Sequence, residues 1–129
     1  MFISELSDQQ QQVLINLAFH VMFADGQLDE SELNLLENLK SQCRQKVMQQ
    51  GADMSELTEQ FVNHEDKIAL MLELVMVVMA DEVCHESEVF VLDDIAKRID
   101  VTEKQLDECK LWVKQYTKLQ EQAKALMKG

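Results

Sequence analysis

The sequence predicts an all-α protein, a single-domain helical bundle of about six to seven helices. Its 129 residues include no proline and only three glycines, so the chain offers little of the turn chemistry that many short strands need. Two runs, residues 13–24 and 68–80, are apolar at almost every position. Helices that are apolar on nearly all sides must be enclosed by other helices, which predicts a bundle built around these two segments.

Residues that can cap a helix divide the chain into the expected elements. Ser7, with Gln10 three residues later, has capping-box spacing, and the first helix ends before Gly26. Asp29 with Glu32 opens a second helix, which we expect to run toward residues 50–51. The other expected helices are a short third one capped by Asp53 or Ser55, a fourth capped by Asn63, a fifth from about 85 to 99, and a final one from Thr102 to about 127.

An acidic phrase occurs twice, each time at the end of one of the apolar runs. Residues 24–33 read ADGQLDESEL and residues 80–89 read ADEVCHESEV, so a shift of 56 residues aligns Ala, Asp, Glu, Ser and Glu. This predicts a duplicated helix–loop–helix within one domain of residues 1–129. Repeat 1 is expected at about 8–50, repeat 2 at about 64–100 and the C-terminal helix at about 102–127. We expect the two hairpins to pack about a pseudo-two-fold axis with their apolar helices in contact.

The net charge of −12 is unevenly distributed and limits the classes of partner. Residues 1–39 hold seven acidic residues and no lysine or arginine, whereas the chain from Thr102 onward holds six lysines against four acids. Nucleic-acid binding needs cations that displace counterions from phosphate, so no nucleic-acid partner is predicted. A cation, or a basic surface on a protein partner, fits this charge.

The sequence shows no pattern of a signal peptide or of a membrane span. The N-terminal stretch MFISELSDQQQQ has no basic segment before an apolar core, and the longest apolar runs are about a dozen residues. Cys43, Cys84 and Cys109 share no CxxC spacing, so we expect free thiols in a reducing compartment. These features predict a cytoplasmic protein without membrane insertion.

The first acidic phrase matches the rear half of an EF-hand calcium loop, but the front half is missing. With Gly26 at loop position 6, Asp29 falls at position 9 and Glu32 at position 12, as an EF-hand requires. Positions 1 and 3 are then Val21 and Phe23, which carry no side-chain oxygen. Because calcium takes roughly six to eight oxygen ligands, the sequence excludes an EF-hand.

Two interpretations of the acidic phrase stay open. In the first, the carboxylates cap a rigid corner between two helices and favour the positive end of the helix dipole. In the second, carboxylates of both copies converge and hold a divalent cation, namely calcium, magnesium or manganese. The capping interpretation explains most of the phrase, but the second copy keeps three acids although His85 replaces the capping Asp29, which gives the second interpretation modest support. The candidate metal ligands are Asp25, Asp29, Glu32, Asp81, Glu86 and Glu88.

The same residues resemble the TerB family, named for tellurite resistance, and the related domain of some membrane-anchored J-domain cochaperones. The shared pattern is an apolar helix ending in Ala24-Asp25-Gly26, followed by Asp29 and Glu32, with a weaker second copy; the resemblance spans about residues 8–112. It implies an all-helical fold with an internal two-fold and acidic loops that bind divalent cations. It also implies a role in stress-response or membrane-associated complexes without established catalysis. The chain departs from the pattern at residues 82–85, where Gly and the usual acid are missing.

Some side chains outside the acidic phrases also carry expectations. His20 is expected to be a hydrogen-bonded core or seam histidine, and Glu73, the only charge in residues 68–80, to emerge on an exposed stripe. On the final helix, Lys110, Lys114 and Lys118 form one stripe. We expect these lysines to face solvent while the helix docks on the core through Trp112, Val113, Tyr116 and Leu119.

The sequence contains no nucleophile–base pair, glycine-rich phosphate loop or metal-hydrolase motif, so no catalysis is predicted. The leading hypothesis is a non-catalytic, cytoplasmic interaction module whose acidic surface binds a protein partner, with a weakly held divalent cation left open. The resemblance adds a stress-response, tellurite-resistance-like role and a membrane-associated complex as a setting. The alternative is a metal-responsive binding protein with a carboxylate site between the two repeat loops.

Overall fold

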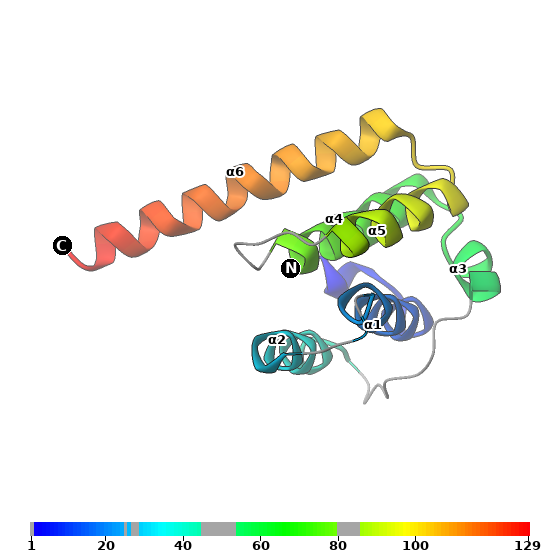
Figure 1. Ribbon diagram of the computed structural model, residues 1–129, viewed down its shortest axis with the longest axis horizontal. Coiled ribbons are helices and arrows are strands. Elements are labelled where there is room, and N and C mark those ends of the chain that lie inside the picture. The colour runs from blue at the N-terminus through cyan, green and yellow to red at the C-terminus, as the bar shows by residue number, and fades with distance from the viewer. Residues whose placement is uncertain (1, 25, 27–28, 45–53, 80–85) are drawn as a thin grey trace.

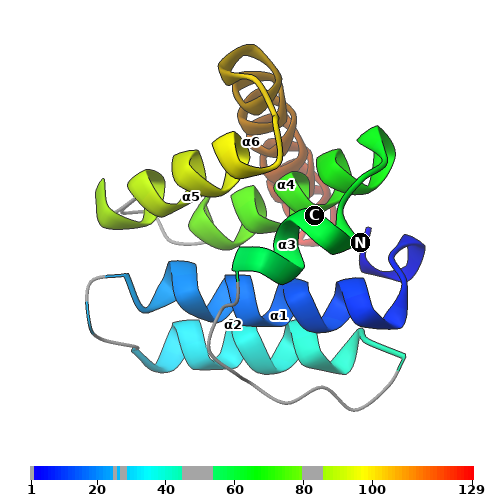
Figure 2. The same cartoon turned by 90° about the vertical axis from the view of Figure 1, so that its right-hand side faces the viewer.

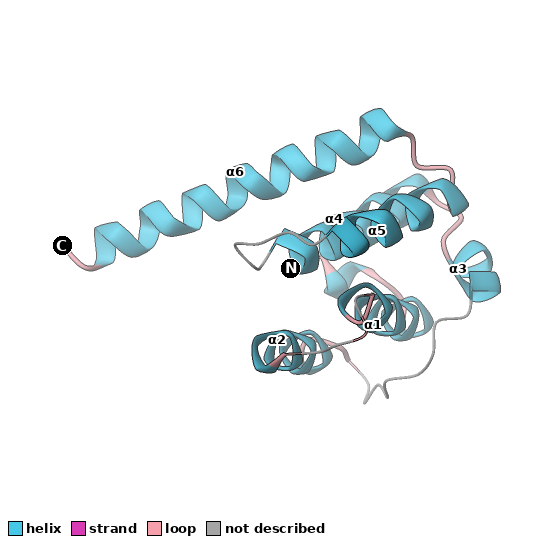
Figure 3. Cartoon of the chain, in the orientation of Figure 1, coloured by secondary structure: helices cyan, strands magenta, loops and turns pink. Residues whose placement is uncertain are grey.

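The computed structural model describes residues 2–24, 26, 29–44, 54–79 and 86–129. These ranges contain helices and connecting segments but no strand (Figure 3), which confirms the predicted all-α class. The elements are a 3-10 turn η1 (Ile3–Glu5) and the helices α1 (Asp8–Met22), α2 (Glu30–Ser41), α3 (Met54–Gln60), α4 (His64–Met79), α5 (Glu86–Arg98) and α6 (Glu103–Met127). Within the same ranges, none of the helices has both the length and the apolar content that crossing a membrane requires.

The two apolar helices, α1 and α4, pack against each other at the centre of the bundle. Helices α2, α3 and α5 pack on α1, while α5, α6 and η1 pack on α4. Figure 2 shows α1 and α2 side by side at the bottom, α4 and α5 above them, and α6 running across the direction of these helices. In Figure 1, α6 extends well beyond the other elements toward the C-terminus.

The duplication expected from the sequence is visible in the helix bounds. A shift of 56 residues carries the first residue of α1, Asp8, onto the first residue of α4, His64. The same shift carries the first residue of α2, Glu30, onto the first residue of α5, Glu86. Each repeat is therefore a helical hairpin with the same starting points, as the repeated phrase predicts.

The buried positions follow the same shift. In α1, Val13, Leu14 and Ile15 are buried, and so are their counterparts Ala69, Leu70 and Met71 in α4. In α2 the buried residues are Glu32, Leu36 and Leu39, and their counterparts in α5, Glu88, Leu92 and Ile95, are buried as well. The fully buried leucines each contribute roughly 1.5–3 kcal/mol relative to exposure. The same packing scheme thus stabilises both hairpins.

The third helices also correspond. Shifting α3 by 56 residues places it on residues 110–116, within the first half of α6. Helix α3 packs on α1 as α6 packs on α4, and Leu57 of α3 and its counterpart Val113 of α6 are both buried. Helix α6 has 25 residues against 7 in α3, so its second half has no counterpart in repeat 1.

Polar side chains tie the start of α1 to the end of α2. The Arg44 guanidinium donates to the Asp8 carboxylate at 3.0 Å, to the Ser4 carbonyl at 2.9 Å and to the Leu6 carbonyl. The backbone N–H of Arg44 donates to Gln11 Oε1 at 3.1 Å. These bonds explain why the prediction that the second helix runs toward residues 50–51 is wrong: α2 ends at Ser41, and the chain turns to meet α1.

The expectations for His20 on α1 and Leu119 on α6 are also wrong. His20 is exposed, because the neighbouring helices leave one edge of α1 uncovered near its C-terminal end, where Phe23 is 46% exposed. Leu119 is 62% exposed instead of docked on the core. Helix α6 leaves the other helices after Val113, the last of its buried residues, so Leu119 has no core to reach.

Candidate functional site

The connection between α1 and α2 carries the first acidic phrase. Helix α1 ends at Met22, and the N–H of Gly26 donates to the Phe23 carbonyl at 2.9 Å. Gly26 has φ +84°, a left-handed conformation that a residue without a Cβ adopts at little cost. Gly26 therefore redirects the chain out of α1 toward the start of α2.

Asp29 and Glu32 form the capping box that their spacing predicts. The Asp29 carboxylate accepts the N–H of Glu32 at 2.8 Å, and Glu32 Oε1 accepts the N–H of Asp29 at 3.4 Å. The Ser31 hydroxyl also donates to Asp29, at 2.9 Å. The pKa of Asp29 is lowered below its usual value, first by the hydrogen bond from the Glu32 backbone and then by that from the Ser31 side chain. Asp29 is therefore ionised at neutral pH and caps the N-terminus of α2.

The predicted ligands occupy different environments. Glu32 is 8% exposed and Glu88 3%, and both are the third residue of their helix. Asp29 and Glu86 are exposed at the helix starts. Asp25 and Asp81 lie outside the described residues, so the predicted convergence of the two loops stays a prediction. In the ranges that the structure describes, no group of three or more histidine, cysteine or carboxylate side chains is placed to hold a metal ion.

Apolar side chains flank the acidic corner. Phe23, just after α1, is 46% exposed and stacks on Phe19 with ring centroids 5.6 Å apart. Leu33, in the first turn of α2, is 45% exposed. Asp29 and Glu30 are exposed between them along the chain. The corner thus carries exposed apolar side chains together with exposed carboxylates.

Glu73 is a buried carboxylate that the sequence analysis placed wrongly on an exposed stripe. It is 2% exposed on α4, and its Oε1 accepts the backbone N–H of Phe2 at 2.6 Å. The 56-residue shift aligns Glu73 with Leu17, which is also buried. The burial of Glu73 could therefore be predicted from the duplication. Its role is to hold the N-terminal segment against α4.

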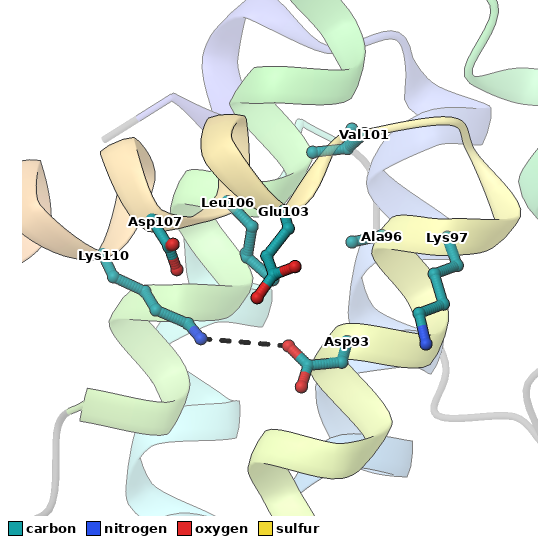
Figure 4. A pocket seen from close by; sticks show the side chains of 8 residues that line it. All are labelled: Asp93, Ala96, Lys97, Val101, Glu103, Leu106, Asp107 and Lys110. Carbon is teal, nitrogen blue, oxygen red and sulfur yellow. Dashed lines mark ion pairs between the residues drawn. The ribbon is translucent and has the colours of Figure 1, made fainter.

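A cavity of about 220 Å³ lies between α5 and α6 (Figure 4). Asp93 of α5 and Lys110 of α6 point toward each other across it and pair at 3.8 Å. The other charged side chains that line it, Glu103, Asp107 and Lys97, have mixed sign. The sequence does not predict this cavity. The lining residues form an ion pair between the two helices, and they include no nucleophile with a neighbouring base.

The two described cysteines are free thiols, as predicted; Cys84 lies outside the described residues. Burial raises the pKa of the half-buried Cys43 and of the buried Cys109. A raised pKa keeps a thiol protonated at neutral pH, and the thiolate is the reactive form. The raised pKa values therefore disfavour a nucleophilic role for Cys43 and Cys109.

Comparison of the chain with family models, curated proteins and solved structures finds no match in any of the three. The fold and the corner define its class, an acidic all-α protein built from a duplicated helical hairpin.

Proposed function

We propose that the protein is a non-catalytic helical interaction module whose acidic corner, the connection between α1 and α2, binds a basic and partly apolar surface of a protein partner. The observation that carries this proposal is the pairing at one corner of exposed Phe23 and Leu33 with exposed Asp29 and Glu30. Large apolar side chains supply most binding energy in interfaces, and surrounding charge steers the partner and sets specificity.

Charge along the chain supports a basic partner. Residues 1–39 contain no lysine or arginine, so no cation within this segment neutralises the corner. Elsewhere in repeat 1, Asp8 pairs with Arg44 and Glu37 with Lys40. Asp29 is held ionised by its hydrogen bonds, and Glu30 is exposed one residue later. The resemblance to the TerB family adds a stress-response or membrane-associated complex as the setting, and the free cysteines and N-terminal sequence add a cytoplasmic location.

The test is capture of partners on the immobilised full chain, quantified by mass spectrometry. Glu30→Lys reverses one charge at the corner and should abolish capture of the specific partner. Glu121→Lys makes the same charge change on α6 and should leave capture intact. Circular dichroism checks that both variants keep their helix content. Equal capture by the wild type and Glu30→Lys would sink the proposal.

The alternative is a divalent-cation site formed by the carboxylates of both repeats. The observation that favours it is the burial of Glu32 and Glu88 at equivalent positions. The capping bond of Glu32 already accounts for one of these carboxylates. A ligand that binds only the folded state raises the melting temperature. We expect such a rise with millimolar calcium, magnesium or manganese, and its loss in the double variant Asp25→Asn, Asp81→Asn; a flat wild-type response excludes this alternative.

A further inference from the structure

The second half of α6 does not pack against the hydrophobic core. Leu106, Cys109 and Val113 are its buried residues, and every residue after Val113 is exposed except the half-buried Tyr116. We call residues 114–128 the arm; Figure 1 shows it projecting away from the other helices. A helix of about 15 residues is marginal in water by itself, because packing supplies most helical stability in proteins. The arm therefore gains stability from any partner that covers it.

Apolar side chains follow one stripe from the core onto the arm. They recur at alternating spacings of three and four residues, which is the spacing of the a and d positions in a coiled coil. Trp112 is 39% exposed, Leu119 62% and Leu126 82%. Trp112 and Tyr116 stack with centroids 5.3 Å apart. The stripe, called the seam below, consists of Cys109, Trp112, Tyr116, Leu119, Ala123 and Leu126.

The residues that flank the seam on the arm carry no charge. In coiled-coil register these flanking positions are Gln115, Gln120, Gln122 and Met127. Like charges at these positions would repel two identical helices. The lysines of the arm occupy other positions of the heptad, on the outer side. The seam is therefore compatible with pairing to its own sequence.

We infer that two copies of this chain associate through the seam, with the two α6 helices antiparallel. The sizes of the side chains along the seam set the direction. In the antiparallel register, Trp112 lies opposite Ala123 and Tyr116 opposite Leu119, so large side chains face smaller ones. Parallel pairing would set Trp112 against Trp112 and Tyr116 against Tyr116.

A pocket at the base of the arm continues the seam. It has a volume of about 270 Å³ between α4 and α6, and its lining includes Ile68, Leu72, Cys109 and Trp112. In the antiparallel register, Leu126 of the second copy lies level with Cys109. Among the residues that the structure describes, Leu126 is the most exposed large apolar one, at 82%, and this pocket is where it would be buried.

The first experiment measures the mass of the full chain by sedimentation equilibrium from about 1 to about 500 µM. A seam of about two heptads is a small interface, so we expect a dimer with a dissociation constant of roughly 10–100 µM. Leu119→Glu places a charge on the seam and should weaken the dimer at least about tenfold. Thr117→Glu makes a similar charge change on the outer side and should match the wild type. Both residues are exposed, so neither change disturbs the fold.

Fluorescence of Trp112, the only tryptophan, gives an independent signal from the seam itself. Its emission should shift to shorter wavelength as concentration rises, in the wild type and Thr117→Glu but not in Leu119→Glu. A monomer at all concentrations, or a dimer unaffected by Leu119→Glu, overturns the inference. Binding of the arm to a different protein or to a lipid surface would appear as the first of these outcomes.

The direction of pairing is tested by placing opposite charges at the flanking positions. In antiparallel pairing, Gln115 of one copy lies beside Gln122 of the other, whereas in parallel pairing these two positions do not meet. The double variant Gln115→Glu, Gln122→Lys should therefore strengthen the dimer about twofold or more. No gain in affinity contradicts antiparallel pairing. The seam lies on a different helix from the α1–α2 corner, so a failed partner capture leaves this result unaffected.

Discussion

The two repeats bury equivalent positions but end in different third helices. Helix α3 has 7 residues and closes repeat 1 against α1, whereas α6 has 25 residues and carries its second half into solvent. The shared positions account for the fold, because equivalent residues of α2 and α5 are buried in both hairpins. The difference in the third helices leaves the second half of α6 exposed, and this arm has no counterpart in repeat 1.

A second difference lies at the centre of the bundle. Leu17 of α1 and Glu73 of α4 occupy equivalent buried positions, one apolar and one ionisable. Glu73 accepts the N–H of Phe2, and the Phe2 ring packs on Trp112 with centroids 5.5 Å apart. Repeat 2 thus uses a polar core residue to fasten the N-terminal segment beside the base of α6.

The largest expected effect comes from the shared core. Leu36→Ala and Leu92→Ala remove equivalent buried side chains, and each should lower the free energy of unfolding by about 2–5 kcal/mol. Urea denaturation measures both values. Leu33→Ala, at a half-exposed site on α2, is the matched control and should cost less than about 1 kcal/mol. A difference of more than about 2 kcal/mol between the two core variants would break the equivalence of the repeats.

The next largest effect on the free energy of unfolding is expected at the position where α1 has Leu17 and α4 has Glu73. Glu73→Leu gives α4 the residue type that α1 has at this position, and it removes the acceptor of the Phe2 N–H. We expect a loss of about 1–3 kcal/mol in the free energy of unfolding. Glu73→Gln keeps an acceptor oxygen and should lose less. Equal stability of Glu73→Leu and wild type would show that the two positions are interchangeable.

A smaller effect is expected where α5 ends. Asp100 has φ +60°, and the N–H of Val101 donates to the Ala96 carbonyl at 2.9 Å, as in a Schellman motif. Asp100→Gly should raise the free energy of unfolding by about 0.5–1 kcal/mol, because glycine adopts this conformation without strain. Its counterpart in repeat 1 is Arg44, where Arg44→Gly should destabilise instead through loss of the bonds to Asp8 and Ser4. Thermal melts distinguish the two signs.

The smallest effect is a pH dependence at the cap of α2. The pKa of Asp29 is lowered from its usual 3.8, so its stabilising bonds are fully present above that value and are lost as pH falls through the folded pKa. The difference in melting temperature between wild type and Asp29→Ala should therefore be largest at neutral pH and shrink in acid below about pH 4. Thr102→Ala removes an uncharged cap and should show no such trend over the same range. A constant Asp29→Ala difference down to the lowest accessible pH would contradict this assignment.

The sequence predicts the helices well because apolar periodicity and caps are local signals. The capping boxes at Ser7, Asp29 and Thr102 all form, and the start of the last helix follows from Thr102 alone. The end of α2 was not predictable, since it depends on Arg44 meeting Gln11 and Asp8, which are more than 30 residues away. Such long-range bonds leave no mark on local periodicity.

The candidate site was predictable only in part. The capping role of Asp29 follows from its spacing to Glu32, but the burial of Glu32 and Glu88 depends on how α2 and α5 lie on the central helices. The exposure of Leu119 likewise depends on where α6 leaves the core, because an apolar residue at helical spacing fits a core face and an uncovered seam equally well.

Residue-resolved amide hydrogen exchange tests most directly the claim of two equivalent hairpins with an uncovered arm. We expect equally slow exchange in α1 and α4, and fast exchange beyond Val113 in dilute solution that slows as concentration rises. Slow exchange of the arm at every concentration, or exchange in α4 much faster than in α1, would contradict the account.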